Sequence, residues 1–412
     1  MDATIVTQVD YDAVIIGAGP AGLFCGISCA NPKFKVALLE KNSSPGKKLL
    51  MAGTGQCNLT HSGNIKDFLV HYGQHGKFVR PSLFNYDNLK LINFFEQRGL
   101  RMTELHSGKI FPESLRSKDV LEIMLESCKE AGVDLIYNSP AKSILKQNDH
   151  FIISTPQRSF SSRKVIITTG GMSYPATGST GDGYHLAKIL GHSIIEPSPA
   201  LTPVIVKDYS FAECAGISIP NAKIFLFRCE KKIHETRGDL LFTHKGLSGP
   251  GILDFSRYIA KGDLLKVQLA DFRNEEEFES DFLNQLHIHA KRSIRNCLAQ
   301  YNLPDRLLNH ILDNLGIAND DKASGLNKKD RKMIVSQIMG FPFEVGKLGG
   351  YKEAMATCGG VKLSEVNLKT MESRIVPGLF FAGEVLDIDG DTGGYNLQFA
   401  FSSGALAGQN ME

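Results

Sequence analysis

Residues 12–22 have the sequence Asp12-Ala13-Val14-Ile15-Ile16-Gly17-Ala18-Gly19-Pro20-Ala21-Gly22. The first five are mostly apolar and partly β-branched, which is typical of a buried strand. The other six form the pattern G-x-G-x-x-G, and the small, apolar run Leu23–Ala30 that follows indicates a helix. A second apolar run, Lys35–Leu39, ends in the acid Glu40. A glycine-rich turn between a strand and a helix, with an acid after the next strand, is typical of a dinucleotide-binding βαβ unit.

The chemistry of such a site explains each residue type. Gly17 permits a tight turn, Gly19 lets the backbone approach a pyrophosphate, and Gly22 allows the helix to pack closely on the strand. The free N–H groups at the helix start attract the phosphates. Glu40 can accept hydrogen bonds from both ribose hydroxyls of an adenosine, and its charge repels a 2′-phosphate. We therefore expect a bound dinucleotide; the alternative is a glycine-rich turn that binds nothing.

The C-terminal part of the chain contains a second segment of the same kind. The apolar run Leu379–Ala382 ends in Gly383-Glu384, and the glycine-rich stretch Asp389–Gln398 leads into a helix of small residues, Phe399–Ala407. This order predicts another helix N-terminus that favours an anion. FAD is long enough to need both ends of a chain, so the positions favour FAD over NAD. We expect it to be bound non-covalently, since no attachment residue stands out.

Two patterns between these ends complete the expected domain. Lys164–Thr168 predicts a strand that ends in Thr169-Gly170-Gly171, and the hairpin-like run Ala141–Ser161 precedes it. Only one complete G-x-G-x-x-G is present, so a separate NAD(P) domain is not visible.

The middle of the chain has a different character. Glu196-Pro197-Ser198-Pro199 predicts a linker. Short strand-like runs and then longer helical stretches follow; these are Leu201–Val206, Ala222–Arg228 and Leu264–Leu269, and Glu276–Gln300, Asp305–Leu315 and Lys328–Met339. The expected fold class is therefore α/β, with a Rossmann-like FAD-binding domain built from both chain ends and an inserted mixed β/α domain. We expect residues 1–195 and 344–412 to form the first domain and residues 196–343 to form an inserted substrate or cap domain.

The composition is that of an ordinary globular protein. The chain has 412 residues, 22% of them charged, and a formal net charge of +2. No apolar run is long enough to cross a membrane, and Met1–Asp10 lacks the features of a secretory signal. The eight cysteines are scattered without a CxxC pair, which indicates reduced thiols, and no histidine has metal-ligand spacing. We expect a cytoplasmic protein without a metal site; the sequence leaves its oligomeric state open.

Four segments resemble a known family. They are Lys47–Asn58, Gly170–Tyr184, Leu241–Pro250 and the block from Gly359 to Gly404. In these segments the chain resembles the BaiN/YhiN-like NAD(P)/FAD-dependent oxidoreductases, also called aminoacetone-oxidase-family flavoproteins. The resemblance implies a split FAD domain with an inserted domain. It also implies that the loop Gly53–Asn58 and the helix start Gly394–Leu397 lie near the isoalloxazine. Gln56 stands where the family usually has Arg, so the resemblance implies no charged role at that position.

The positions that we expect to contact the cofactor come from these patterns. They are Gly17, Ala18, Gly19, Pro20, Ala21, Gly22, Glu40, Lys41, Lys47, Gly55, Asn58, Ala141, Thr169, Gly170, Gly171, Gly383, Glu384, Gly394, Tyr395, Asn396 and Leu397.

No catalytic residue can be named from the sequence. Cys57 is either a thiol near the flavin or part of the lining of its loop. Tyr174 contacts the substrate or is a packed residue. His244 is an acid/base group, a flavin contact or a hydrogen-bonded turn histidine.

The leading functional hypothesis is an FAD-dependent oxidoreductase that acts on a small organic substrate. NADH, NADPH or the substrate reduces the flavin, and an organic acceptor or oxygen reoxidises it. An FAD-dependent enzyme that modifies RNA and a non-catalytic redox sensor are the alternatives. The small net charge and the expected lack of interleaved aromatic and basic residues disfavour nucleic acid as a partner.

Overall fold

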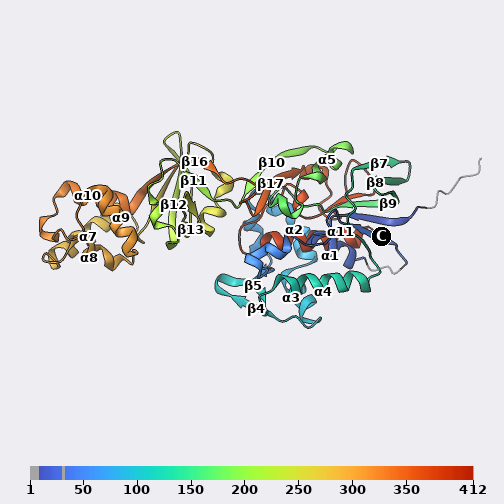
Figure 1. The fold of residues 1–412 in the computed structure, drawn as a ribbon, viewed down its shortest axis with the longest axis horizontal. Coiled ribbons are helices and arrows are strands. Elements are labelled where there is room, and N and C mark those ends of the chain that lie inside the picture. The colour runs from blue at the N-terminus through green and yellow to red at the C-terminus, as the bar shows by residue number, and fades with distance from the viewer. Residues whose placement is uncertain (1–8, 30–32, 412) are drawn as a thin grey trace, which may run out of the picture. The chain divides into compact units, whose positions relative to one another are not determined.

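The computed structural model describes residues 9–29 and 33–411 (Figure 1). The chain forms two compact units, one of residues 1–199 and 354–412 and the other of residues 200–353. Of the stretch Met1–Asp10, in which we expect no signal sequence, residues 1–8 lie outside the described residues.

The first unit is built on a sheet with strand order β6-β2-β1-β9-β8-β7, and β18 pairs with the end of β9. β1, β2, β6, β9 and β18 run parallel, whereas β7 and β8 form an antiparallel hairpin beside the first half of β9. The strands are β1 (Tyr11–Ile16), β2 (Val36–Leu39), β6 (Asp134–Ile136), β7 (Ser143–Gln147), β8 (His150–Ser154), β9 (Ser159–Ile167) and β18 (Leu379–Phe381).

The parallel strands form because their residues are apolar on both faces. Val14, Ile15 and Leu38 are fully buried, as expected of a sheet covered on both sides. The carboxyl ends of parallel strands share one edge of the sheet. The turn after β1, Glu40 after β2, and the segments after β9 and β18 therefore reach the same edge.

Helices from both ends of the chain pack together in this unit. α1 (Pro20–Ile27) lies against α11 (Tyr395–Asn410), which begins four residues earlier than Phe399, where the sequence predicted it. The contact depends on small residues: a Cβ on Gly404 would lie 2.3 Å from the Ala21 carbonyl oxygen, and one on Gly408 would lie 2.3 Å from that of Cys25. The other α-helices of the unit are α2 (Gly76–Asn85), α3 (Asn88–Glu96), α4 (Ser117–Glu130) and α5 (Asp182–Ile189).

Two small sheets accompany the main one. β3 (Thr60–His61), β5 (Lys109–Pro112) and β4 (Met102–Leu105) form a three-stranded sheet, and β10 (Ile194–Ala200) pairs with β17 (Ala356–Val361). Glu196–Pro199, which we expected to be a linker, therefore lies within a strand. Proline is tolerated there because each strand of a two-stranded sheet has an unpaired edge.

The second unit contains a closed antiparallel barrel with strand order β11-β14-β13-β12-β15-β16. The strands are β11 (Val204–Val206), β12 (Ser218–Arg228), β13 (Lys231–Phe242), β14 (Gly246–Ser248), β15 (Leu264–Gln268) and β16 (Phe341–Leu348). The sequence prediction omitted β13, whose first residues are exposed and polar. Only one face of a barrel strand is buried, so its apolar signal is weak.

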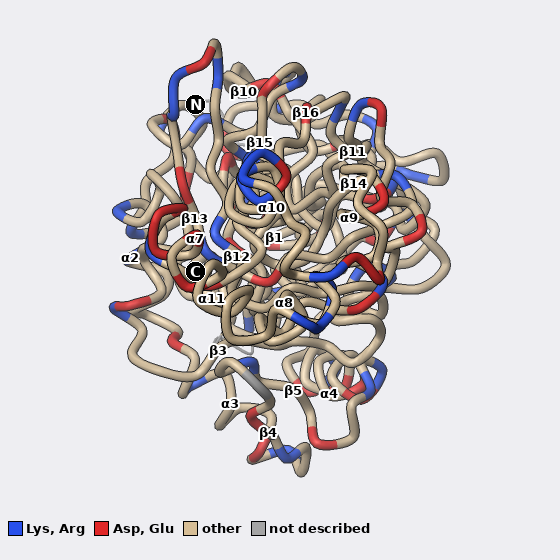
Figure 2. The backbone as a smooth tube through the Cα atoms, turned by 90° about the vertical axis from the view of Figure 1, so that its left-hand side faces the viewer, with Lys and Arg blue, Asp and Glu red and all other residues tan. Residues whose placement is uncertain are grey.

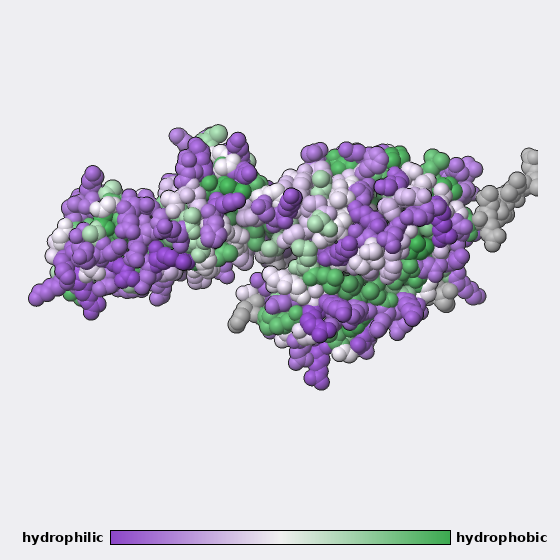
Figure 3. All heavy atoms as spheres, in the orientation of Figure 1, coloured by the Kyte–Doolittle hydropathy of each residue, from purple (hydrophilic) through white to green (hydrophobic). Residues whose placement is uncertain are grey.

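Helices precede β16 in this unit. They are α6 (Pro250–Leu253), α7 (Glu275–Ile288), α8 (Ile294–Leu298), α9 (Asp305–Leu315) and α10 (Lys328–Gly340). The helical stretch that we predicted over Glu276–Gln300 is divided, because α7 ends at Ile288 and α8 begins at Ile294. Ser293 begins a new helix there by accepting a hydrogen bond from the Asn296 N–H through its side chain. The surface over α7, α8 and α10 is mostly hydrophilic (Figure 3).

Several absences hold for the described part of the chain. Within residues 9–29 and 33–411, no helix has both the length and the apolar character of a membrane span. The same residues contain no cluster of three or more His, Cys, Asp or Glu side chains that could hold a metal ion. None of the eight cysteines, all of which are described, forms a disulfide. Basic and acidic positions are interspersed along the backbone (Figure 2), in keeping with the small net charge.

Candidate functional site

The glycines after β1 differ sharply in the space around them. Gly17 has φ 107° and, with a Cβ, would meet the Thr168 carbonyl oxygen at 2.8 Å. A Cβ on Gly22 would lie 2.0 Å from the Gly17 carbonyl oxygen. A Cβ on Gly19, in contrast, has no heavy atom within 4 Å. Gly17 and Gly22 thus shape the turn, whereas Gly19 faces open space.

Gly19 is also the N-cap of α1. No side chain caps this helix end among the described residues, and Pro20 occupies the first turn. Proline removes one N–H that would lack a partner, and the remaining ones are free to bind an anion.

Glu40 is a buried carboxylate held at the end of β2. Its Oε2 accepts a hydrogen bond from the Ala18 N–H at 3.1 Å, and its Oε1 accepts from the N–H and the amide of Asn42, both at 2.8 Å. A carboxylate has about four acceptor sites, so these three bonds fix its orientation and leave capacity for another donor. Asn42, which the sequence analysis did not single out, is thus a positioning partner of Glu40.

The neighbours of Glu40 connect it to later parts of the chain. Lys41 Nζ lies 2.6 Å from Asp182 Oδ2, at the first residue of α5. The Ser139 N–H donates to the Glu40 carbonyl oxygen, and Ala141 lies two residues further on, partly buried. Lys47 is partly buried in the loop before the 3-10 helix Leu49–Gly55.

The segment after β9 packs tightly against the segment before β18. A Cβ on Gly171 would lie 2.4 Å from Thr357 Oγ1, which accepts hydrogen bonds from the N–H groups of Met172 and Ser173. Gly170 has φ 74°, and a Cβ at this position would lie 3.9 Å from Glu384 Oε2. Thr169 Oγ1 is buried without a hydrogen-bond partner among the described residues.

Glu384 is the centre of a hydrogen-bond network. Lys48 Nζ lies 2.6 Å from Glu384 Oε2 and 2.5 Å from Ser173 Oγ. Glu384 Oε1 accepts from Ser173 Oγ at 3.1 Å and from the Thr357 N–H at 2.9 Å. Four separate segments of the chain therefore meet at this carboxylate. Lys48, Ser173 and Thr357 were missed as site residues because no local pattern joins them.

The start of α11 contacts the loop after the 3-10 helix Leu49–Gly55. Gly394, the N-cap, has φ 98°, and a Cβ there would lie 2.6 Å from the Thr60 backbone. With its amide oriented to satisfy both groups, Asn58 accepts from the Gly394 N–H and donates to the Thr60 carbonyl oxygen, each at 3.1 Å. No side chain caps the following N–H groups of α11 within the described residues. The positions predicted near Gly55–Asn58 and Gly394–Leu397 are thus brought together.

Tyr395 packs between two histidines. Its ring stacks on His71 with centroids 4.0 Å apart and on His61 at 5.3 Å. His71 Nδ1 lies 2.9 Å from Asp391 Oδ2, and Asn396 accepts a hydrogen bond from the Gly390 N–H. No local pattern marks His61 or His71, because their partners lie more than three hundred positions further along the chain.

Three sequence candidates for chemistry have different surroundings. Cys57 is fully buried, and burial raises the pKa of its thiol to about 12, so the thiol stays protonated at neutral pH. Tyr174 has φ 53° and is partly buried before a short 3-10 helix. His244 is exposed and belongs to the second unit. Gln56, which stands where the family usually has Arg, is the C-cap residue of the 3-10 helix Leu49–Gly55.

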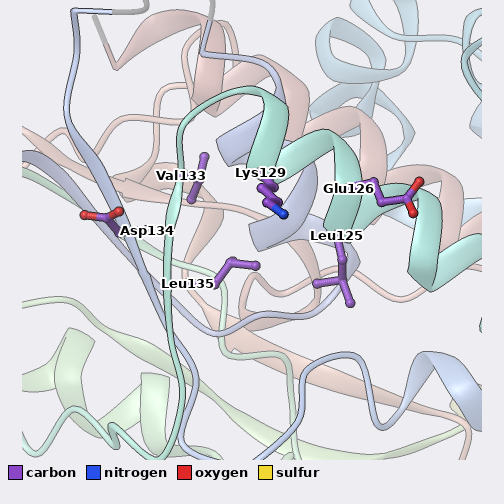
Figure 4. Close-up of a pocket in the computed structure, with 6 residues that line it drawn as sticks. All are labelled: Leu125, Glu126, Lys129, Val133, Asp134 and Leu135. Carbon is purple, nitrogen blue, oxygen red and sulfur yellow. The ribbon is translucent and has the colours of Figure 1, made fainter.

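A separate hollow of about 400 Å³ opens where α4 approaches β6 (Figure 4). It is lined by Leu125, Glu126, Lys129, Val133, Asp134 and Leu135. None of the predicted site residues lines this hollow.

The first unit contains two uncapped helix starts, two carboxylates held by hydrogen bonds, and a glycine that faces open space. Each helix start offers N–H groups and a partial positive charge to an anion. The carboxylates are acceptors for hydroxyl groups. This combination suits a long ligand with phosphates in its middle and hydroxyl-bearing parts on either side.

Comparisons with known proteins agree over almost the whole chain. The family model described as HI0933-like protein Rossmann domain matches residues 11–410. The ribosomal RNA dihydrouridine synthase of Escherichia coli (strain K12) is 30% identical over 410 residues, which are 97% of this chain and 98% of the relative. That of Haemophilus influenzae is 32% identical over 397 residues, 95% and 96% of the two chains.

A third relative has a different named substrate. The 3-dehydro-bile acid delta(4,6)-reductase of Clostridium scindens is 30% identical over 404 residues, 96% of this chain and 97% of the relative. Among solved structures, the 3-ketosteroid-delta4-(5alpha)-dehydrogenase from Rhodococcus jostii RHA1 matches with a TM-score of 0.50 at 14% identity, over 99% of each chain. At that identity the likeness concerns the fold alone, and it confirms the expected α/β class with a Rossmann-like domain.

Proposed function

Because this chain belongs to the HI0933-like Rossmann family, we propose that it is an FAD-dependent reductase of a carbon–carbon double bond conjugated to a carbonyl group. The preferred substrate is a uracil base in RNA. The observation that carries the proposal is the presence of two uncapped helix starts, at Gly19 and Gly394, in one unit. We also propose that the enzyme acts in the cytoplasm.

The described residues fit FAD. The open space at Gly19 admits a pyrophosphate that a side chain would exclude, and the N-terminus of α1 supplies N–H groups to it. Glu40 would accept a ribose hydroxyl of the adenosine half, and Glu384 would accept a hydroxyl of the ribityl chain. The loop at Asn58 and the start of α11 would hold the ring system.

The chain's own residues contribute electrostatics and shape. When bound, FAD supplies the two-electron chemistry that connects NADH or NADPH to the substrate. The N-terminus of α11, at Gly394–Leu397, stabilises negative charge placed beside it. Cys57 lines its loop as a protonated, buried thiol and exchanges no electrons. The Asn58 side chain fixes the position of Gly394 and thereby the direction of the α11 dipole.

The substrate class follows from the chemistry that the relatives' names share. Dihydrouridine forms when the ring double bond of uracil, conjugated to a carbonyl, gains two hydrogens. The delta(4,6) double bonds named for the third relative are likewise conjugated to a carbonyl group, the 3-oxo group of the bile acid. One flavin site can serve both reactions, and two of the three full-length relatives named above act on ribosomal RNA. RNA is therefore the first choice, and a small cyclic enone is the second candidate because of the third relative.

Anaerobic flavin spectroscopy tests the proposal. The FAD-loaded protein is first mixed with NADH or NADPH, and we expect the flavin absorbance to disappear. The reduced protein is then mixed with a uridine-containing ribosomal RNA fragment or with a 3-oxo steroid that has a conjugated double bond. Return of the absorbance with RNA, together with a gain of two hydrogens on a uridine in the mass spectrum, is the expected result.

Other outcomes point elsewhere. If the steroid restores the absorbance and RNA does not, the substrate is a small cyclic enone and not RNA. Reduction of the flavin by an aminoketone but by neither nicotinamide would indicate an amine oxidase. A protein that retains no FAD after reconstitution would overturn the proposal as a whole.

A further inference from the structure

The outer surface of the barrel in the second unit contains a cluster of aromatic and basic side chains. Along β12, Ile224 and Leu226 are fully buried inside the barrel. Lys223, Phe225 and Phe227 alternate with them and are partly exposed. Side chains alternate between the two faces of a strand, so these three lie on the outside.

The neighbouring strands add cations to this surface. Lys223 is paired in register with Arg237 of β13, and Phe225 with Lys266 of β15. We call the set of Lys223, Phe225, Phe227, Lys232, Arg237 and Lys266 the aromatic–basic face.

Each ring on this face has an ammonium group over it. Lys223 Nζ lies 4.9 Å and Lys232 Nζ 5.5 Å from the centre of the Phe225 ring. Lys266 Nζ lies 5.1 Å from the centre of the Phe227 ring. The expectation that the chain lacks interleaved aromatic and basic residues is therefore wrong. The pattern depends on pairing across three strands, so it is only partly visible along the sequence.

The charges of the face are incompletely balanced. Lys232 pairs with Glu235 at 2.9 Å, and Arg237 pairs with Asp271 at 3.1 Å. Lys223 and Lys266 form no ion pair within the described residues. Glu235, in register with Phe225, also interacts electrostatically with Lys223. The four cations of the face still outnumber these two acids. This excess of positive charge beside two partly exposed rings suits a ligand that offers both negative charge and flat aromatic groups.

We propose that the aromatic–basic face binds single-stranded RNA, a choice of partner that rests on the function proposed above. Bases stack on the rings of Phe225 and Phe227, and the lysines move from the rings to the phosphates. The two phenylalanines are two positions apart on one strand, about 7 Å, so each ring meets a different base. A single strand suits the face because its bases are exposed for stacking.

Binding of a fluorescein-labelled oligouridine, followed by fluorescence anisotropy, tests this inference on the full-length, FAD-loaded protein. Lys223→Gln with Lys266→Gln should weaken binding about tenfold and reduce the slope of log affinity against log salt by about 1.4, or 0.7 per lost phosphate contact. Phe225→Leu with Phe227→Leu should weaken binding about tenfold and leave that slope unchanged, because stacking involves no counterion release.

Two lysines elsewhere in the second unit provide a matched control. Lys328 and Lys329 are exposed at the start of α10, and Lys328→Gln with Lys329→Gln removes the same charge. This variant should bind as the parent does. If it loses as much affinity as the β12 and β15 lysine variant, or if the parent does not bind oligouridine, the inference is overturned.

Failure of this inference can be distinguished from failure of the proposed function. Reduction of the flavin by NADH or NADPH should be unchanged in all three variants, which shows that the first unit is folded. An unchanged far-UV circular dichroism spectrum and an unchanged unfolding transition show that the second unit is folded as well. If the parent reduces uridines in RNA but the face variants bind oligouridine normally, the proposed function remains and the face has no role in RNA binding. If the face variants lose binding although no uridine is reduced, the face binds RNA and the catalytic proposal is wrong.

Discussion

Lys48 and Glu384 form an ion pair of 2.6 Å although 336 residues separate them along the chain. The pair joins an early and a late segment of the first unit, because Lys48 follows the βαβ segment and Glu384 follows β18. Ser173 and Thr357 bond to the same carboxylate. The two ends of the chain are thus connected by a polar network as well as by the packing of α1 on α11.

Removal of Lys48 should destabilise the first unit. In Lys48→Met the Glu384 carboxylate, which is 20% exposed, would lose its cation and retain only its neutral donors. We expect the free energy of unfolding of the FAD-free protein to fall by about 2 kcal/mol, less than for a fully buried pair. Urea unfolding followed by circular dichroism measures this, and adding Glu384→Gln should restore part of the loss.

An exposed ion pair serves as the control for that measurement. Lys118 and Glu122 lie 3.3 Å apart on α4 with side chains 70% and 53% exposed. Lys118→Met should change the free energy of unfolding by less than about 0.5 kcal/mol. Equal losses in the two variants would mean that the Lys48 pair has no special role.

Gly404→Ala should weaken the contact between α1 and α11. The added methyl would lie 2.3 Å from the Ala21 carbonyl oxygen, so one helix must shift. We expect a loss of about 2 kcal/mol in the free energy of unfolding of the first unit, although alanine favours a helix. Differential scanning calorimetry should show the transition at a lower temperature. Gly325→Ala, at a position with no heavy atom within 4 Å, should leave both units unchanged.

The local elements of the fold could be predicted from the sequence. The glycine pattern fixed the βαβ segment, and the apolar periodicity of α9 gave both of its ends, Asp305 and Leu315. Family membership, suggested by the motifs, is confirmed by the match over residues 11–410. β13 was missed because its outward positions are polar, and β10 because prolines usually mark turns.

The site could be predicted only where a local motif marks it. Gly19 and Glu40 lie within one βαβ unit, so their spacing is informative. The partners of Glu384 are scattered over the chain, and only the folded structure shows that Ser173 and Thr357 meet it. The stacking of His71 on Tyr395 is hidden for the same reason.

Gly19→Ala and Gly22→Ala should separate cofactor binding from folding. Gly19 has an extended conformation with φ −86°, and its Cβ would face open space, so the FAD-free protein should lose less than about 1 kcal/mol. The methyl would obstruct the pyrophosphate, and FAD affinity, measured by flavin fluorescence, should fall at least about tenfold. In Gly22→Ala the methyl would lie 2.0 Å from the Gly17 carbonyl oxygen, and both stability and affinity should fall. Unchanged FAD affinity in Gly19→Ala would contradict the proposed position of the pyrophosphate.

The pair of the buried His192 and the partly buried Glu365 should make the first unit sensitive to acid. His192 Nδ1 lies 3.2 Å from Glu365 Oε2, and its Nε2 lies 2.8 Å from Ser373 Oγ. Burial lowers the pKa of His192 below its usual value of 6.5, against the opposing effect of Glu365. The pKa of Glu365 is lowered as well: burial opposes the shift, and hydrogen bonds from Ser193 and the nearby His192 outweigh it.

Both shifts act in the same direction on stability. As the pH falls below about 6.5, His192 becomes protonated in the unfolded chain but not in the folded chain, because its pKa is lower in the folded state. The free energy of unfolding therefore falls by up to about 1.4 kcal/mol per pH unit. Glu365 adds to this loss as the pH falls below 4.5, its usual pKa, because the unfolded carboxyl is protonated first. Urea unfolding of His192→Gln between pH 7 and pH 5 should therefore show a shallower decline than the parent protein. His185→Gln, which removes an exposed histidine on α5, should decline as the parent does. A decline in His192→Gln as steep as that of the parent would show that another group causes the acid sensitivity.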